Sequence, residues 1–236
     1  MATIIGFDTA TEETVVGATI DGESSFEFRS GPADGDRPAH SSELLPAIER
    51  AVESVGGWTE VDRVATGVGP GTYTGLRVAV ATARGIALAR TAEVVGVPTL
   101  EAMARSIYRA AEEGDPVIAV PALDARRGEL FFAAYDRSGR EVHPASVGPP
   151  AILVEAISRL GVPSLVAGPG ALRFRSELVA QGLEPAGVDD PENHLLGSAI
   201  CELGDQEDRN WQGSLEPIYL RAPDAERWTR ERRKGD

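Results

Sequence analysis

Cysteine is almost absent from this chain of 236 residues. Cys201 is the only one, which excludes an internal disulfide and a metal site built from several thiolates. No apolar run approaches the roughly 20 residues that a membrane-spanning helix needs. The N-terminus, MATIIGFDTATEE, lacks the basic segment and the cleavage site of a signal peptide. We therefore expect a cytoplasmic protein that does not associate with a membrane.

Positive charge is also scarce, since the formal net charge is −14 and the isoelectric point is about 4.7. A protein that binds a phosphate backbone by itself normally presents a basic face, so direct binding of nucleic acid is disfavoured. One dense basic patch lies near the C-terminus, and we interpret it as a solvated terminal segment. It consists of Arg227, Arg230, Arg232, Arg233 and Lys234, the only lysine.

The first part of the chain alternates turn signals with short apolar runs, which predicts a β-meander. The runs are Ala2–Phe7, Thr14–Ile20 and Ser24–Arg29. After a polar loop, Ser41 or Ser42 is expected to cap a helix that has one apolar face. That face consists of Leu44, Leu45, Ile48, Val52 and Val55. Gly56 and Gly57 are expected to end the helix.

A strand, a helix, a second strand and a second helix follow, which completes the order βββαβαβα. The predicted elements are a strand at Val61–Val68, a helix to about Arg90, a strand at Val94–Val97 and a helix from Thr99 to about Glu112. This order is typical of an α/β unit in which parallel crossovers follow a meander.

The same pattern then restarts, because Val117–Leu123 and Leu130–Tyr135 again predict two strands joined by a turn. Asp8 and Asp124 each follow the first strand of their half. Later the strand Leu165–Ala167 enters GPGALRF and a helix to Ala180, as the strand before GPGTYTG does. These echoes predict a duplicated supersecondary unit.

The glycine-rich stretch GVGPGTYTGLR, residues 67–77, lies between a predicted strand and a predicted helix, where proteins often hold phosphate. It contains no lysine and does not match the P-loop spacing. It misses the dinucleotide fingerprint by one residue, and it has Tyr73 where a nucleophile elbow needs serine. Thr72 or Thr74 can cap the helix, and the free N–H groups either bind an anion or are simply capped.

The helix behind this loop is small and weakly polar on nearly every side. Its small residues are Ala79, Ala81, Thr82, Ala83, Gly85, Ala87 and Ala89, and its charged residues are Arg77, Arg84 and Arg90. Such a helix is usually buried on two sides. One side must face its own sheet, and the other faces either a second subunit or the second half of the same chain.

Titratable residues give little sign of a catalytic site. His40, His143 and His194 are isolated, and no metal-binding histidine pair is present. We interpret His40 as a capping or surface residue, and Cys201, in an expected helix at Leu195–Leu203, as a core residue. Asp8 and Asp124 are placed either to form Asx turns or to orient a metal or water.

Several segments together resemble the bacterial TsaB (YeaZ) family over nearly the whole chain. They are IIGFDTAT, GVGPGTYTGLRVAVATARGIA, GVPTLEAMA, LDARRGELFFAAYD and EPIYLR. The residues that match the family's loops are Asp8, Thr9, Thr11, Gly69, Pro70, Gly71, Thr74, Gly75, Asp124, Arg126, Gly128 and Glu129.

The resemblance implies two related βββαβαβα domains of the superfold shared by actin, sugar kinases and heat-shock ATPases, the second one degenerate. The implied domains are residues 1–113 and 114–214, followed by a tail, 215–236, that packs back on the first domain. The catalytic paralogue TsaD carries an H-x-x-x-H metal motif and nucleotide loops. His40 has no partner four residues further on, so that motif is absent here.

The resemblance therefore implies a subunit without catalysis or cofactor that supports tRNA N6-threonylcarbamoyladenosine synthesis. It implies binding to TsaD, recruitment of the ATPase TsaE, a homodimer when TsaD is absent, and contact with tRNA only through the complex. The implied interface residues are Leu44, Leu45, Ile48, Val52, Arg77, Ala79, Val80, Ala83, Arg84, Gly85 and Ala87. The alternative is an enzyme of the same superfold, either a threonylcarbamoyl transferase, a metallopeptidase that needs three metal ligands, or a kinase that binds ATP.

Overall fold

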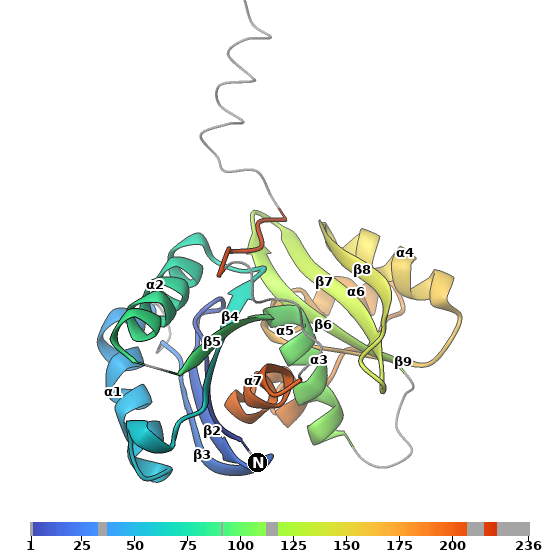
Figure 1. Ribbon diagram of the computed structural model, residues 1–236. Coiled ribbons are helices and arrows are strands. Elements are labelled where there is room, and N and C mark those ends of the chain that lie inside the picture. Colours follow the sequence, from blue (N-terminus) through green and yellow to red (C-terminus); the bar gives the residue numbers. More distant parts are fainter. Residues whose placement is uncertain (1, 33–36, 91, 112–117, 207–214, 221–236) are drawn as a thin grey trace, which may run out of the picture.

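The computed structural model describes residues 2–32, 37–90, 92–111, 118–206 and 215–220. The basic patch of the tail and the implied boundary at residue 113 lie outside these residues. Two sheets lie next to each other, with helices on their outer faces and between them (Figure 1). Within the described residues, no helix is both long and apolar enough to span a membrane.

The first sheet has the strand order β3-β2-β1-β4-β5. Its strands are β1 (Thr3–Asp8), β2 (Thr14–Ile20), β3 (Glu23–Ser30), β4 (Arg63–Gly69) and β5 (Glu93–Pro98). The pairs β1–β2 and β2–β3 are antiparallel, whereas β1–β4 and β4–β5 are parallel. This confirms the predicted meander and crossovers.

The helices α1 (His40–Ser54) and α2 (Tyr73–Ala89) lie side by side on the outer face of the first sheet (Figure 1). A short 3-10 helix, η1 (Trp58–Glu60), follows α1. The helices α3 (Thr99–Ala110) and α7 (Gly197–Gly204) cover the opposite face, between the two sheets. Cys201 of α7 is fully buried there, which confirms it as a core residue.

The second sheet repeats the first without its fifth strand, since its order is β8-β7-β6-β9. Its strands are β6 (Ile118–Arg126), β7 (Glu129–Asp136), β8 (Glu141–Gly148) and β9 (Ser164–Ala167). Again β6–β7 and β7–β8 are antiparallel and β6–β9 is parallel. The duplication predicted from the two echoes is therefore present in the strand topology.

Outer helices of the second half are α4 (Pro150–Leu160), α5 (Pro169–Arg173) and α6 (Arg175–Ala180), and a 3-10 helix, η2 (Pro191–Asn193), precedes α7. The sequence patterns do not predict β8 or α4. It predicts one helix where α5 and α6 are separated at Phe174, whose backbone leaves the helical conformation.

Two predictions about the start of α1 are wrong. Neither Ser41 nor Ser42 caps the helix, because it begins at His40 and the Ser42 hydroxyl instead donates to the Ala39 carbonyl. His40 is neither a cap nor a surface residue. Its side chain is buried, and its Nδ1 lies 2.9 Å from the Thr14 hydroxyl, so it ties α1 to the start of β2.

Candidate functional site

Asp8 ends β1 at the point where a phosphate or metal would be held if the turn were catalytic. The side chain is 1% exposed. Its Oδ1 accepts a hydrogen bond from the Ala10 amide at 2.5 Å, which is the predicted Asx turn. Its Oδ2 accepts from the Thr99 hydroxyl at 2.6 Å, and that hydroxyl in turn accepts from the Gly69 amide at 3.1 Å. Both oxygens are thus bonded inside the protein.

Burial also changes the ionisation of this carboxyl. Removal from water raises the pKa of Asp8 to about 6, against the opposing effect of the hydrogen bonds from Thr99 and Ala10. This carboxyl is enclosed and hydrogen-bonded through both oxygens, and it joins the ends of β1 and β4 to the start of α3. Thr99 was not predicted as part of this site, although it lies in the family segment GVPTLEAMA.

The glycine-rich loop packs directly against the turn that follows Asp8. A Cβ added to Gly67, Gly71 or Gly75 would overlap the Asp8 carboxylate, the Ala10 carbonyl or the Thr9 carbonyl, respectively. Gly69 has φ +99°, a left-handed conformation that favours glycine, and precedes a cis peptide bond to Pro70. The glycines therefore allow two backbone segments to approach closely.

Several polar groups at the start of α2 are hydrogen-bonded within the chain. The Thr72 hydroxyl accepts from the Gly75 amide at 3.2 Å, so Thr72 is the N-cap and Thr74 is not. The Thr72 amide donates to the Ala10 carbonyl at 2.7 Å, and the Thr9 hydroxyl donates to the Gly75 carbonyl at 2.7 Å. These contacts favour the structural reading of the loop over an anion site.

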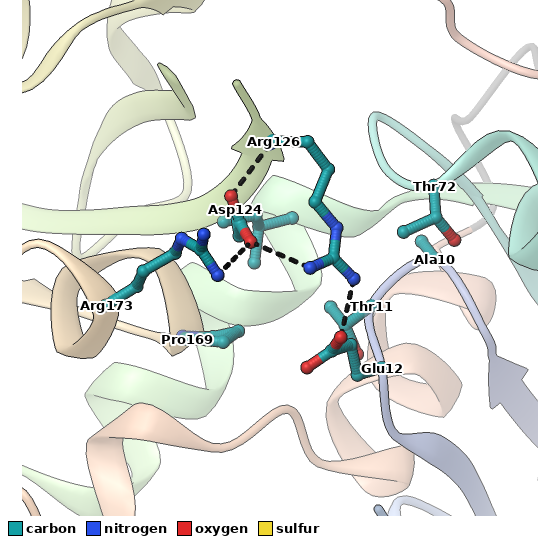
Figure 2. Close-up of a pocket in the computed structure, with 9 residues that line it drawn as sticks. Ala10, Thr11, Glu12, Thr72, Asp124, Arg126, Pro169 and Arg173 are labelled. Atoms are coloured by element: carbon teal, nitrogen blue, oxygen red, sulfur yellow. Dashed lines mark hydrogen bonds and ion pairs between the residues drawn. The ribbon is translucent and has the colours of Figure 1, made fainter. Parts of the chain in front are cut away.

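A small cleft separates the Asp8 turn from the second half of the chain (Figure 2). Its lining residues are Ala10, Thr11, Glu12, Thr72, Leu123, Asp124, Arg126, Pro169 and Arg173. Its volume is about 90 Å³, whereas small-molecule sites usually occupy about 300–1,000 Å³. A nucleotide does not fit this volume without a rearrangement.

Charged side chains of alternating sign form a row of ion pairs across the cleft. Arg126 extends from the β6–β7 turn to the Glu12 carboxylate, and its other amino group lies 3.4 Å from Asp124 (Figure 2). Arg173 of α5 also lies 3.4 Å from Asp124. Sequence reasoning missed Glu12 and Arg173, because only the tertiary fold brings these turns together.

Asp124 forms the predicted Asx turn, since its Oδ1 accepts from the Arg126 amide at 2.8 Å. The rest of the turn has the left-handed backbone of a tight β-hairpin, with φ values of +63° at Arg126 and +79° at Gly128. Glu129 begins β7 and pairs with Arg126 across the two strands. The DARRGE segment is therefore a hairpin whose arginine reaches the first half of the chain.

The three histidines lie apart from one another. His40 bonds Thr14, the His143 ring stacks on Phe132, and His194 lies 3.3 Å from Glu13. Across the described ranges, no group of three histidine, cysteine or acidic side chains is placed to hold a metal ion.

The implied interface residues divide into a buried and an exposed group. The side chains of Leu44, Ile48, Val52, Ala79, Val80 and Ala83 are buried in the chain's own core, so a partner cannot reach them. Those of Leu45, Arg77, Arg84, Gly85 and Ala87 are exposed. Five further exposed positions of α2 were missed in that set, namely Tyr73, Thr74, Ala81, Leu88 and Ala89.

The outer face of α2 is open, although the helix is apolar. Leu88 is 91% exposed and Tyr73 55% exposed, and a Cβ added to Gly85 would meet nothing within 4 Å. The described residues of the second half do not cover this face, since α2 packs on α1, β1, β4 and β5. Of the two readings of this helix, burial under the second half is therefore wrong.

The segment 215–220 packs against the edge of α2 and the end of β4. The Ile218 amide donates to the Val68 carbonyl at 2.7 Å, and Arg84 donates to the Leu215 carbonyl at 3.0 Å. The Tyr219 ring lies 5.9 Å from the Tyr73 ring. These described residues of the tail lie on the first half, and they leave the outermost stripe of α2 uncovered.

Two α/β units with the same strand topology, each containing an aspartate turn and a Gly-Pro-Gly loop, make up the described part of the chain. The fold resembles that of the ethanolamine utilization protein EutJ from Carboxydothermus hydrogenoformans, with a TM-score of 0.51, 17% identity and coverage of 86% of this chain and 90% of that chain. Residues 36–179 match the family model of TsaD, tRNA N6-adenosine threonylcarbamoyltransferase. Together with the relatives and structures that follow, this match shows that the chain belongs to the TsaB (YeaZ) family.

Named relatives and solved structures carry this assignment. The chain is 33% identical to the tRNA threonylcarbamoyladenosine biosynthesis protein TsaB of Escherichia coli over 135 residues, which cover 57% of this chain and 55% of that protein. It is 31% identical to TsaB of Haemophilus influenzae over 132 residues, which cover 56% of this chain and 52% of that protein. The chain thus spans about half the length of these two relatives. YeaZ from Pseudomonas aeruginosa superposes with a TM-score of 0.68 at 26% identity and covers 93% of this chain and 100% of that chain.

Proposed function

We propose that the chain is an accessory subunit of tRNA threonylcarbamoyladenosine synthesis, which binds TsaD and supports the recruitment of TsaE without catalysing a step itself. The names of its relatives support the pathway. TsaB of both E. coli and H. influenzae is called a tRNA threonylcarbamoyladenosine biosynthesis protein.

One observation carries the non-catalytic part of this proposal, and it is the enclosure of Asp8. A carboxylate that binds a nucleotide-bound metal must reach the cleft, whereas both oxygens of Asp8 are bonded inside the protein. The charged side chains of Arg126, Glu12 and Asp124 further occupy the cleft. This arrangement supports a role in binding partners rather than in catalysis.

The partner surface that we propose is the outer face of α1 and α2. It offers the exposed Leu45, Tyr73 and Leu88 next to arginines. Tyrosine and arginine are the residue types that most often dominate binding energy in interfaces. The acidic charge of the chain, −14, is consistent with tRNA contact through the partner subunits rather than directly.

Reconstitution with cognate TsaD and TsaE tests the proposal. We expect tRNA modification from threonylcarbamoyl-adenylate to require this chain, and the chain alone to give no modified tRNA. Gly85→Arg, on the outer face of α2, is expected to abolish co-purification with TsaD while the protein stays folded. Ala83→Arg serves as a contrast, because this buried position should unfold the chain. Turnover by the chain alone would overturn the proposal.

A further inference from the structure

The cleft between the two halves is lined by charges of both signs in equal number. Its charged residues are Glu12, Asp124, Arg126 and Arg173. Glu12 belongs to the first half, whereas the other three belong to the second half and face it across the cleft (Figure 2). The four charges cancel one another, although each end of the cleft carries a strong local charge.

The two guanidinium groups of the cleft converge on one point. The Arg126 Nη1 and Arg173 Nη1 atoms each lie 3.4 Å from the same Asp124 oxygen, Oδ2. Arg126 extends from the β6–β7 turn and Arg173 from α5, so they approach that oxygen from different elements (Figure 2). A guanidinium has five N–H donors. Both arginines therefore keep donors for a second carboxylate.

The ion pairs of the cleft can be exchanged at low cost. The side chains of Arg126 and Glu12 are 48% and 52% exposed, and that of Arg173 is 53% exposed. Solvent screens pairs of this kind, so they contribute little to stability. A ligand that offers an equivalent charged group can therefore take the place of one partner.

The remaining lining is apolar or carries a hydroxyl group, and it consists of Ala10, Thr11, Thr72, Leu123 and Pro169. The Thr11 hydroxyl accepts from a backbone amide at 3.1 Å, and the Thr72 hydroxyl does so at 3.2 Å. A hydroxyl that accepts still has its own proton to donate. With a volume of about 90 Å³, the cleft has room only for a small ligand with a short apolar side chain.

Charge and volume together restrict the class of ligand. Phosphate or another simple anion is attracted by the arginines but repelled by Glu12 and Asp124, and a simple cation meets the reverse situation. A nucleotide exceeds the volume. A free α-amino acid carries a carboxylate and an ammonium group separated by one carbon atom, so it offers both signs within a small molecule.

We propose that this cleft binds a small zwitterionic α-amino acid. Its carboxylate accepts from Arg126 and Arg173, a pairing for which guanidinium groups are well suited. Its ammonium group donates to Glu12, which exchanges Arg126 for the ligand. Asp124 stays between the arginines and orients them. This site lies in the cleft and not on the partner face of α1 and α2, so the inference does not depend on the proposed function.

An NMR titration of the ¹⁵N-labelled full chain with L-alanine tests the site. We expect saturable shifts at the amides of Thr11, Glu12 and Arg126, with a dissociation constant on the order of 1 mM because so small a ligand makes few contacts. Glycine should bind similarly, and L-phenylalanine should not, since its ring exceeds the cleft. Acetate, methylammonium and inorganic phosphate should each bind roughly tenfold more weakly or worse, since each offers one sign only.

Two single variants separate the two charges of the ligand. Arg173→Gln and Glu12→Gln should each raise the dissociation constant for L-alanine by roughly tenfold. Glu12→Gln should at the same time strengthen the binding of acetate, because the neutral side chain no longer repels an anion. A purely structural role of Glu12 would not produce these opposite changes.

The control is Arg159→Gln, which removes an arginine that is 77% exposed on α4, outside the cleft. It should leave both dissociation constants unchanged. Circular dichroism should show that every variant is folded, because all three positions are exposed. The inference is wrong if L-alanine causes no saturable shift at the cleft amides, if acetate or phosphate binds as tightly as L-alanine, or if the control weakens binding as much as Arg173→Gln. The titration uses neither TsaD nor tRNA, so its outcome leaves the proposed function untouched.

Discussion

The two halves of the chain end their first strands in the same aspartate turn, yet they place it in different surroundings. In each half the Oδ1 atom accepts from the amide two residues further on, Ala10 for Asp8 and Arg126 for Asp124. Asp8 is then covered, whereas Asp124 lines the cleft between two arginines. The turn therefore follows from local chemistry, and its burial depends on what packs over it.

The helices after the two Gly-Pro-Gly loops differ still more. The first loop leads into α2, which is 17 residues long, and the second leads into α5, which is 5 residues long and ends at Phe174. Only the first sheet has a strand beyond this crossover, since β5 has no counterpart in the second sheet. The shared strand frame thus tolerates large changes in the helix that follows its Gly-Pro-Gly loop.

Replacing a glycine of either Gly-Pro-Gly segment should have the largest effect on stability. The size of the loss measures how closely each loop approaches the aspartate turn of its own half. Gly75→Ala is expected to lower the free energy of unfolding by more than about 3 kcal/mol, because the new Cβ would overlap the Thr9 carbonyl. Gly170→Ala should cost less, about 1–3 kcal/mol, since its Cβ would lie 2.6 Å from the Leu123 carbonyl carbon. Urea denaturation measures both.

Gly85→Ala is the matched control within α2. Its Cβ would meet nothing within 4 Å, so replacing a helical glycine there should stabilise the protein by about 0.5–1 kcal/mol. A Gly75→Ala protein as stable as this control would contradict the close approach of the loop to the Asp8 turn.

The pH dependence of Asp8 gives the next largest effect. Its pKa in the folded protein is about 6, above the ordinary value of 3.8. This group therefore adds stability below pH 4, and that contribution is lost as the pH rises from about 4 through 6. The loss amounts to roughly 3 kcal/mol, since one pKa unit corresponds to about 1.4 kcal/mol. The stability of Asp8→Asn minus that of the unchanged chain should rise by this amount between pH 4 and pH 7.

Thr99→Val tests the hydrogen bond to Asp8 through the same pH dependence of stability. The Thr99 hydroxyl lowers the pKa of Asp8 by bonding its ionised form, so its removal should extend the loss of stability to higher pH. Identical pH profiles for the unchanged chain and Thr99→Val would exclude this hydrogen bond as an influence on Asp8.

A substitution in the cleft should have the smallest effect on stability. Arg126→Ala removes the pair with Glu12, in which both side chains are about half exposed. Solvent screens such a pair, so the free energy of unfolding should fall by less than about 1 kcal/mol. Thermal denaturation would detect the change, and a loss of several kcal/mol would mean that this contact holds the two halves together more firmly than we infer.

Periodicity and turn residues predict most of the strand frame. The elements of the first half, the hairpin of the second and the burial of Cys201 follow from these patterns. The strand β8 and the helix α4 were not predicted. The pattern also could not show that Leu44 is buried and Leu45 exposed, because neighbouring apolar positions on a helix look alike until the sheet beneath them is known.

The sequence by itself determined the turns, the order of strands and helices and the repetition of one unit, because these depend on contacts between residues close in the chain. Only the tertiary structure decided that Asp8 is enclosed, that Glu12 meets Arg126 across 114 residues, and that the outer side of α2 is open. These features depend on backbone segments that are far apart in sequence, and local patterns contain no information about which of them meet.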